Sequence, residues 1–194
     1  MDASTVVLEA GTAVAARPFT ALERTQTDLA ALARMRAALA RRLAAGAAAG
    51  TWEEDGEVHL LVAPRPDALA RPALAVGFFS QARDIDHGPI LHLEYALLDR
   101  VDAVEGFVSY HNVRFADGRW GNLVTFDDQG GPTQVRDHPI HRDALALTAV
   151  HYRTVRLHRL RLTDGAAGIT EPELRETLFF DFDETPPWRA VRAG

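Results

Sequence analysis

The sequence predicts an α+β protein built on an antiparallel β-sheet with two main helices. Three observations carry this prediction. Apolar residues recur at helical spacing over residues 20–45, the apolar period then changes to two residues, and an Asp-Gly pair at 117–118 joins two alternating segments. A period of about 3.6 is typical of helices and a period of two is typical of strands. An Asp-Gly pair between alternating segments favours a tight hairpin, which makes the sheet antiparallel.

The first main helix is expected over residues 20–45, after a short strand at 4–8. Thr20 followed by Glu23 fits a capping box at the start of the helix. Gly46 is a suitable residue to end it, because glycine readily adopts the left-handed conformation that closes many helices. A one-sided apolar stripe indicates that the helix packs against a core. The stripe consists of Leu22, Leu29, Leu32, Met35 or Arg36, Leu39 and Leu43.

The strands of the sheet are expected after this helix. The second main helix is expected to begin at Pro139, because proline suits the first helical position. The tail from Ile169 is expected to cross the surface as a strap. The segments with the alternating or β-rich pattern of strands are 58–63, 73–79, 90–97, 106–115, 120–127 and 151–162.

The length of 194 residues and the hydrophobic share of 47% fit a single globular domain. We therefore expect one domain over residues 1–194, in three parts. Residues 1–50 form the N-terminal strand and long helix, residues 51–165 form the antiparallel sheet with one helix, and residues 166–194 form the C-terminal strap.

Composition excludes several kinds of chemistry and partner. The chain has no cysteine, and all 21 of its basic residues are arginine, so thiolate nucleophiles, iron–sulfur clusters and lysine Schiff bases are excluded. A net charge of −6 and the absence of a basic patch argue against a nucleic-acid partner. The sequence has no apolar run long enough to span a membrane and no signal-peptide pattern at its start. A cytoplasmic location is therefore expected.

The order of elements over 106–162 resembles part of a known superfamily. A strand Gly106-Phe-Val-Ser-Tyr-His-Asn-Val-Arg-Phe is followed by a strand Trp120-Gly-Asn-Leu-Val-Thr-Phe, a segment His138-Pro-Ile-His and a strand His151-Tyr-Arg-Thr-Val-Arg-Leu-His. This order resembles the second half of a ferredoxin-like unit in the dimeric α+β barrel superfamily. Antibiotic-biosynthesis monooxygenases, some polyketide cyclases and haem-binding enzymes belong to that superfamily. The resemblance implies a small-molecule substrate. A sheet with one exposed face favours pairing with a second copy, so a homodimer is expected.

One hypothesis for the site is a non-haem metal centre. His92 and Glu94 share one face if 90–97 is a strand, and His111 lies on another predicted strand. Two histidines and one carboxylate suit non-haem iron or zinc. A second hypothesis, which the resemblance allows, is haem bound through an axial histidine. His141 and His158 are the candidates for this axial ligand.

A third hypothesis needs no cofactor. His111 or His92 acts as a general base, because histidine titrates near cellular pH, and Tyr110 or Arg114 stabilises an enolate or phenolate. The remaining candidates are expected to bind the substrate. Trp120 and Asn122 resemble the substrate-flanking residues of the monooxygenases, and Tyr152 and Arg156 share one face of the last predicted strand.

The candidate residues predict a small-molecule enzyme, and the resemblance implies a setting in bacterial secondary metabolism. The enzyme would be an oxygenase or a cyclase/isomerase that acts on an aromatic or carbonyl-bearing metabolite by acid–base chemistry. The alternative is a haem-dependent enzyme or a haem or small-molecule binding protein. The cofactor stays open between none, haem and a non-haem metal.

Overall fold

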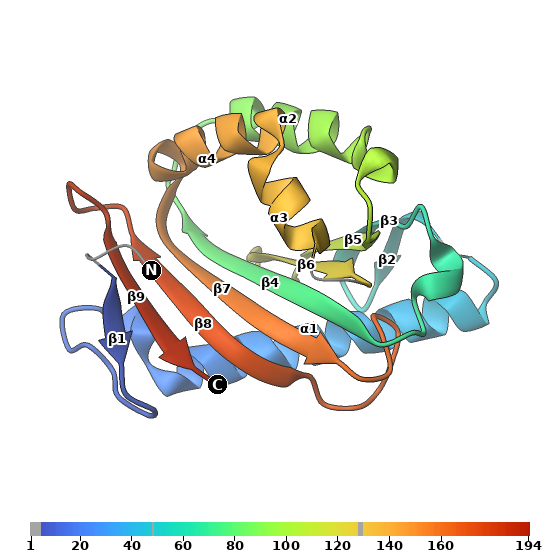
Figure 1. Cartoon of the computed structure of the whole chain (residues 1–194), viewed down its shortest axis with the longest axis horizontal. Helices are drawn as coiled ribbons and strands as arrows, with labels where there is room; N and C mark the ends of the chain where they lie inside the picture. The colour runs from blue at the N-terminus through green and yellow to red at the C-terminus, as the bar shows by residue number, and fades with distance from the viewer. Residues whose placement is uncertain (1–4, 48, 128–129) are drawn as a thin grey trace.

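The computed structural model describes residues 5–47, 49–127 and 130–194. The strands form one sheet in the order β1-β9-β8-β7-β4-β6-β5-β3-β2. Figure 1 shows α1 on one side of this sheet and α2, α3 and α4 on the other. The strands are β1 (Val6–Leu8), β2 (Gly50–Glu54), β3 (Glu57–Val62), β4 (Ala73–Ala82), β5 (Phe107–Arg114), β6 (Trp120–Phe126), β7 (Tyr152–Leu162), β8 (Glu173–Asp181) and β9 (Trp188–Ala193). The helices are α1 (Leu22–Ala44), α2 (Gly88–Leu98), α3 (Gly130–Asp137) and α4 (Pro139–His151).

The centre of the sheet is a ferredoxin-like unit. Along the chain its elements run β4-α2-β5-β6-α4-β7, and in the sheet its strands stand in the order β7-β4-β6-β5. Each neighbouring pair among these four strands is antiparallel. The predicted α+β class and ferredoxin-like arrangement are therefore confirmed. Strands β8, β9 and β1 extend one edge of this unit, and β3 and β2 extend the other.

The long helix is confirmed as α1, but its predicted capping box is wrong. Ala21 is the N-cap residue, and no side chain caps it. The hydroxyl of Thr20 donates instead to the carbonyl of Arg17, at 2.8 Å. Gly46 does end the helix, with a φ of 81° and an amide that donates to the carbonyl of Leu43 at 2.9 Å. Only a residue that tolerates positive φ closes a helix in this way.

The main core lies between α1 and the sheet. Leu32, Met35 and Leu39 on α1 are fully buried. Gly77 of β4 lets the helix approach closely, since a Cβ atom at this position would lie 2.8 Å from Cδ1 of Leu32. The face of the ferredoxin-like unit opposite α2 and α4 is therefore filled within the chain. None of the described helices is long and apolar enough to cross a membrane.

The strand predicted over 90–97 is wrong, because this segment belongs to α2. Pro89 stands in the first turn, where its fixed φ favours a helix. Ile90, Glu94 and Leu97 then share the helix face that lies against the sheet, at the spacing i, i+4 and i+7. Short apolar runs of this length fit both periods. The alternation of Leu91, His92, Leu93 and Glu94 gave the misleading signal.

The prediction of a C-terminal strap is also wrong, because residues 173–181 and 188–193 form strands β8 and β9. Strand β8 pairs antiparallel with β7, and a salt bridge of 2.6 Å between Arg159 and Glu176 joins them. Thr177 and Phe179 are buried while Leu178 and Phe180 on the other face are half-buried. The expected boundary between the sheet, up to residue 165, and the strap, from residue 166, therefore falls between two paired strands of one sheet.

Candidate acid–base site

A carboxylate on α2 meets polar side chains of two strands. Glu94 Oε1 accepts a hydrogen bond from the Tyr110 hydroxyl at 2.7 Å and another from Asn112 Nδ2 at 3.2 Å. Asn122 Nδ2 donates to the Tyr110 hydroxyl at 3.2 Å. Tyr110 and Asn112 are two residues apart on β5, so both point to the face that α2 covers. Register places Asn122 opposite Asn112, which brings all four side chains together.

Burial gives this cluster unusual acid–base properties. It raises the pKa of Glu94, and the hydrogen bonds from Tyr110 and Asn112 offset only part of this effect. Burial and the neighbouring Glu94 raise the pKa of Tyr110 well above its ordinary value of 10. A carboxyl group whose pKa is raised is a better proton acceptor and a donor nearer to neutral pH. Such groups concentrate at functional sites.

Tyr152, at the start of β7, adds a second hydroxyl beside this cluster. Its ring packs edge-on against Phe78 of β4, with the ring centroids 5.6 Å apart. Burial and the charge of Glu94 raise the pKa of Tyr152 to about 12. The hydroxyl therefore stays protonated at cellular pH and is able to donate a hydrogen bond to a ligand. Both Tyr152 and Glu94 are only half-buried, so the site keeps contact with solvent.

Two histidines stand next to Tyr152, and their contacts define their tautomers. His87 Nε2 lies 3.0 Å from the carbonyl oxygen of Arg83, which only accepts, so this nitrogen carries the proton. His87 Nδ1 must then accept from His151 Nδ1, at 3.2 Å. His151 Nε2 is left with its lone pair. Burial and the neighbouring His87 lower the pKa of His151, which keeps the ring neutral.

The predicted metal centre of His92, Glu94 and His111 does not form. On a helix, His92 and Glu94 point in nearly opposite directions, and His92 is exposed. His111 lies on the α1 side of the sheet, because it alternates with Tyr110 and Asn112. Within the described ranges, no group of three or more histidine, aspartate or glutamate side chains is placed to hold a metal ion.

His111 is buried on the α1 side of the sheet, away from the Glu94 cluster. Its Nε2 lies 3.1 Å from His59 Nδ1, and its ring stacks on Trp52 with centroids 5.4 Å apart. Burial, and to a smaller extent the nearby His59, lower the pKa of His111 to about 3. The ring is therefore a weak base at cellular pH, and it faces away from Tyr110 and Arg114. The predicted pairing of His111 with either residue is wrong.

Arg156 and His158 also belong to the α1 side, within a buried network around Asp28. Arg156 donates to both carboxylate oxygens, at 2.6 and 3.0 Å. His158 Nε2 lies 2.9 Å from Oδ2 of Asp28, and its Nδ1 lies 3.0 Å from the Thr177 hydroxyl. Both ring nitrogens of His158 are engaged, so it is not free to ligate haem. Arg156 is likewise committed to Asp28 and not available to a substrate on the α2 side.

The remaining predicted residues lie outside the cluster. Trp120 is 49% exposed on β6, and Arg114 is exposed at the end of β5. His141 on α4 is half-buried, with Nδ1 3.4 Å from the carbonyl oxygen of Arg136. The structure thus brings together Glu94, Tyr110, Asn122 and Tyr152 from the predicted set.

The prediction missed three residues of this region. Asn112 had a visible signal, since it is two residues from Tyr110 on the same strand. His87 and His151 had none, because they meet only when the loop before α2 and the end of α4 come together.

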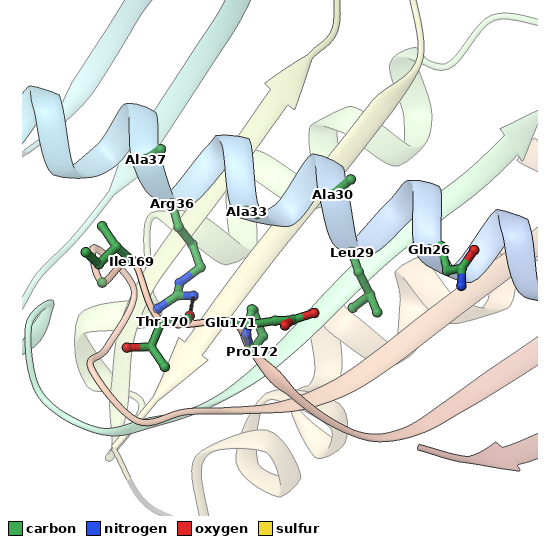
Figure 2. A pocket seen from close by; sticks show the side chains of 11 residues that line it. Gln26, Leu29, Ala30, Ala33, Arg36, Ala37, Ile169, Thr170, Glu171 and Pro172 are labelled. Atoms are coloured by element: carbon green, nitrogen blue, oxygen red, sulfur yellow. Dashed lines mark hydrogen bonds between the residues drawn. The ribbon is translucent and has the colours of Figure 1, made fainter.

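A separate cavity of about 400 Å³ lies between α1 and the loop before β8 (Figure 2). Arg36 is part of its lining, but its guanidinium is already paired with Asp164 at 2.5 Å and with the carbonyl of Thr170 at 2.5 Å. Burial would raise the pKa of Asp164, but hydrogen bonds from Thr170 and Arg36 outweigh burial and lower this pKa to about 2. The charge of Arg36, which lines the cavity, is therefore already balanced by Asp164. None of the predicted site residues lines this cavity.

These observations define the class of the protein as a ferredoxin-like α+β protein with a buried carboxyl–tyrosine cluster under α2. No protein-family model and no curated protein sequence matches the chain. Two solved structures resemble about half of the chain. One is the protein NE2512 of unknown function from Nitrosomonas europaea, with 16% identity, a TM-score of 0.41, and coverage of 48% of this chain and 91% of that chain. The other is a dimeric ferredoxin-like protein of unknown function from Thermobifida fusca, with 16% identity, a TM-score of 0.38, and coverage of 47% and 92%.

Proposed function

We propose that this protein is a small-molecule enzyme in which Glu94 transfers a proton. The observation that carries the proposal is a half-buried carboxyl group with a raised pKa, held at 2.7 Å by the Tyr110 hydroxyl. Its neighbours are hydrogen-bonding groups rather than a basic side chain that would neutralise it. Structural carboxylates in this chain instead pair with arginine, as Asp28 does with Arg156.

The residues divide the work of a cofactor-free proton transfer between them. Glu94 accepts a proton from an acidic C–H or phenolic O–H group of the substrate. The Tyr152 hydroxyl donates a hydrogen bond to the enolate or phenolate oxygen that develops, which stabilises the negative charge. Tyr110 and Asn112 hold the carboxylate in place, and Asn122 orients Tyr110. Isomerisation or cyclisation of a carbonyl-bearing or aromatic metabolite fits this set of groups best.

Solvent deuterium exchange tests this proposal without knowledge of the natural substrate. A panel of phenyl ketones in D₂O, followed by proton NMR, should include members whose α-hydrogens exchange faster with the protein than without it. Glu94→Gln should lower the catalysed rate by about 10²-fold or more, because a positioned acid–base group contributes on the order of 10²–10⁴-fold. The amide keeps the shape of the side chain but accepts no proton at cellular pH.

Glu173→Gln on β8 is the matched control, because Glu173 is an exposed carboxylate. This variant should exchange at the wild-type rate. Equal rates in Glu94→Gln and the wild-type protein would remove Glu94 from the chemistry.

The homodimer also belongs to this proposal. Because α1 covers one face of the ferredoxin-like unit, a second copy would have to pair through another surface. Large apolar side chains that stay exposed on α2 and α4 are candidates for that surface. They are Leu91, Tyr95, Leu145 and Val150.

A further inference from the structure

An apolar row crosses the sheet on the face opposite α1. Strand register aligns Phe78 of β4 with Leu157 of β7, Leu157 with Leu178 of β8, and Leu178 with Val191 of β9. These four side chains are half-buried. We call this row the apolar ladder. Neighbouring strands lie about 4.8 Å apart, so the ladder extends over roughly 14 Å.

The contacts of neighbouring residues on β4 and β7 show to which face of the sheet the ladder side chains point. Gly77, before Phe78, faces Leu32 of α1. Arg156 and His158, on either side of Leu157, both contact Asp28 of α1. Side chains alternate along a strand, so Phe78 and Leu157 point away from α1.

The same alternation holds on β8. Thr177 contacts His158, and Phe179 is fully buried with Leu8 and Ala190. Leu178, between Thr177 and Phe179, therefore points to the same side as Leu157. The ladder lies on the side of the sheet that carries α2 and α4 (Figure 1).

One end of the ladder meets the acid–base site. Phe78 is paired in register with Asn122, which donates to the Tyr110 hydroxyl beside Glu94. Phe78 also packs against the ring of Tyr152. A polar end and an apolar body therefore follow one another along a single line across the strands.

Charged side chains flank the ladder two residues further along the strands. Arg159 and Glu176 form an ion pair across β7 and β8 at 2.6 Å. This pair makes the row on that side of the ladder polar, so an apolar body is better accommodated on the ladder than on that row. Burial of half-exposed apolar side chains by such a body would be favourable by the hydrophobic effect.

We propose that the ladder is the floor for the apolar body of an elongated, amphipathic substrate, whose phenol or enol head lies at Glu94 and Tyr152. The inference rests on the proposed function, since the head position is the acid–base site. It adds the substrate class: a hydrogen-bonding head that carries an extended apolar chain or ring system. The acid–base chemistry alone would accept a compact substrate equally well.

Alkylphenols of increasing chain length test the ladder directly. We would measure the Kd of 4-methylphenol, 4-butylphenol and 4-octylphenol by isothermal titration calorimetry. Full burial of a methylene corresponds to about 0.8 kcal/mol, or roughly fourfold in affinity. Because a floor covers only one side of the chain, we expect about half that free energy. The four methylenes between the butyl and octyl compounds should then tighten binding by roughly tenfold or more.

Two variants assign this gain to the ladder. Leu178→Asn places a polar group in its centre, and Val191→Thr changes polarity with almost no change of shape, which guards against a folding defect. Both should reduce the gain from butyl to octyl while leaving the Kd of 4-methylphenol unchanged. Arg175→Gln, at an exposed position on β8, the strand of Leu178, should retain the full gain.

Each other outcome overturns the inference. A gain that persists in both ladder variants would place the chain elsewhere. Binding of 4-methylphenol with no gain in the wild-type protein would reject the ladder while leaving the acid–base site intact. Absence of binding by every alkylphenol would reject the substrate class. The deuterium-exchange experiment would then still test the role of Glu94 in proton transfer. A wild-type dimer that Leu178→Asn converts to a monomer would show that a second copy covers the ladder.

Discussion

Replacement of Asp28 with asparagine should lower the free energy of unfolding by about 3–5 kcal/mol, because it leaves a buried cation without its counter-charge. Asp28 is 1% exposed and accepts hydrogen bonds from Arg156 and His158. Burial alone would raise the pKa of Asp28, yet the hydrogen bonds from His158 and Arg156 outweigh it and lower this pKa. The network therefore holds a charged carboxylate inside the core.

Urea unfolding at neutral pH measures this effect. The control is Asp67→Asn, because Asp67 forms a salt bridge with Arg71 in which both side chains are largely exposed. Exposed pairs contribute about 1 kcal/mol or less, so the control should be nearly neutral. If the two variants lost similar amounts of stability, the buried network would not be the element that fixes α1 on the sheet.

Stability should fall as the pH drops below about 6.5, and His111 should be a main cause. The unfolded chain binds a proton at His111 near pH 6.5, but the folded protein binds it only near pH 3. A lowered folded pKa means that the contribution of this group is fully present above the unfolded pKa. It is lost as the pH falls toward the folded pKa, at about 1.4 kcal/mol per pH unit.

Denaturant unfolding between pH 4 and pH 8 reveals this slope. His111→Phe keeps an aromatic ring beside Trp52 and His59 and removes the titrating group, so it should flatten the slope. His92→Gln on the exposed side of α2 should retain the wild-type slope. A slope that is unchanged in His111→Phe would mean that His111 does not titrate differently in the folded and unfolded states.

The sequence predicted the elements with one clear period more successfully than those with two. The stripe on α1 and the Asp-Gly hairpin between β5 and β6 each have a single interpretation, and both are confirmed. The run 90–97 is apolar at both helical and strand spacing. The contact of Glu94 on α2 with Tyr110 on the facing strand is a tertiary feature that neither pattern contains. Pro89, just before the run, was the local signal that favoured a helix.

Part of the candidate site could be predicted because alternation on a strand is local. Tyr110 and Asn112 share a face by spacing alone. The same alternation places His111 on the opposite face of β5. Which of the two faces α1 covers is set by tertiary contacts, such as that of His158 with Asp28, and the sequence does not contain them. The register that joins Asn122 to Phe78 and the ladder is likewise set by pairing between strands far apart in the chain.

The pKa of Glu94 tests the proposed acid–base site most directly. Carbon-13 NMR of the glutamate side-chain carboxyl groups, assigned by comparison with Glu94→Gln, would follow its titration. We predict a pKa above the ordinary 4.5, with a further rise in Tyr110→Phe, because that variant removes a hydrogen bond that favours the ionised form. A pKa at or below 4.5 in the wild-type protein would show an ordinary carboxylate and would contradict the assignment of Glu94 as the proton-transfer group.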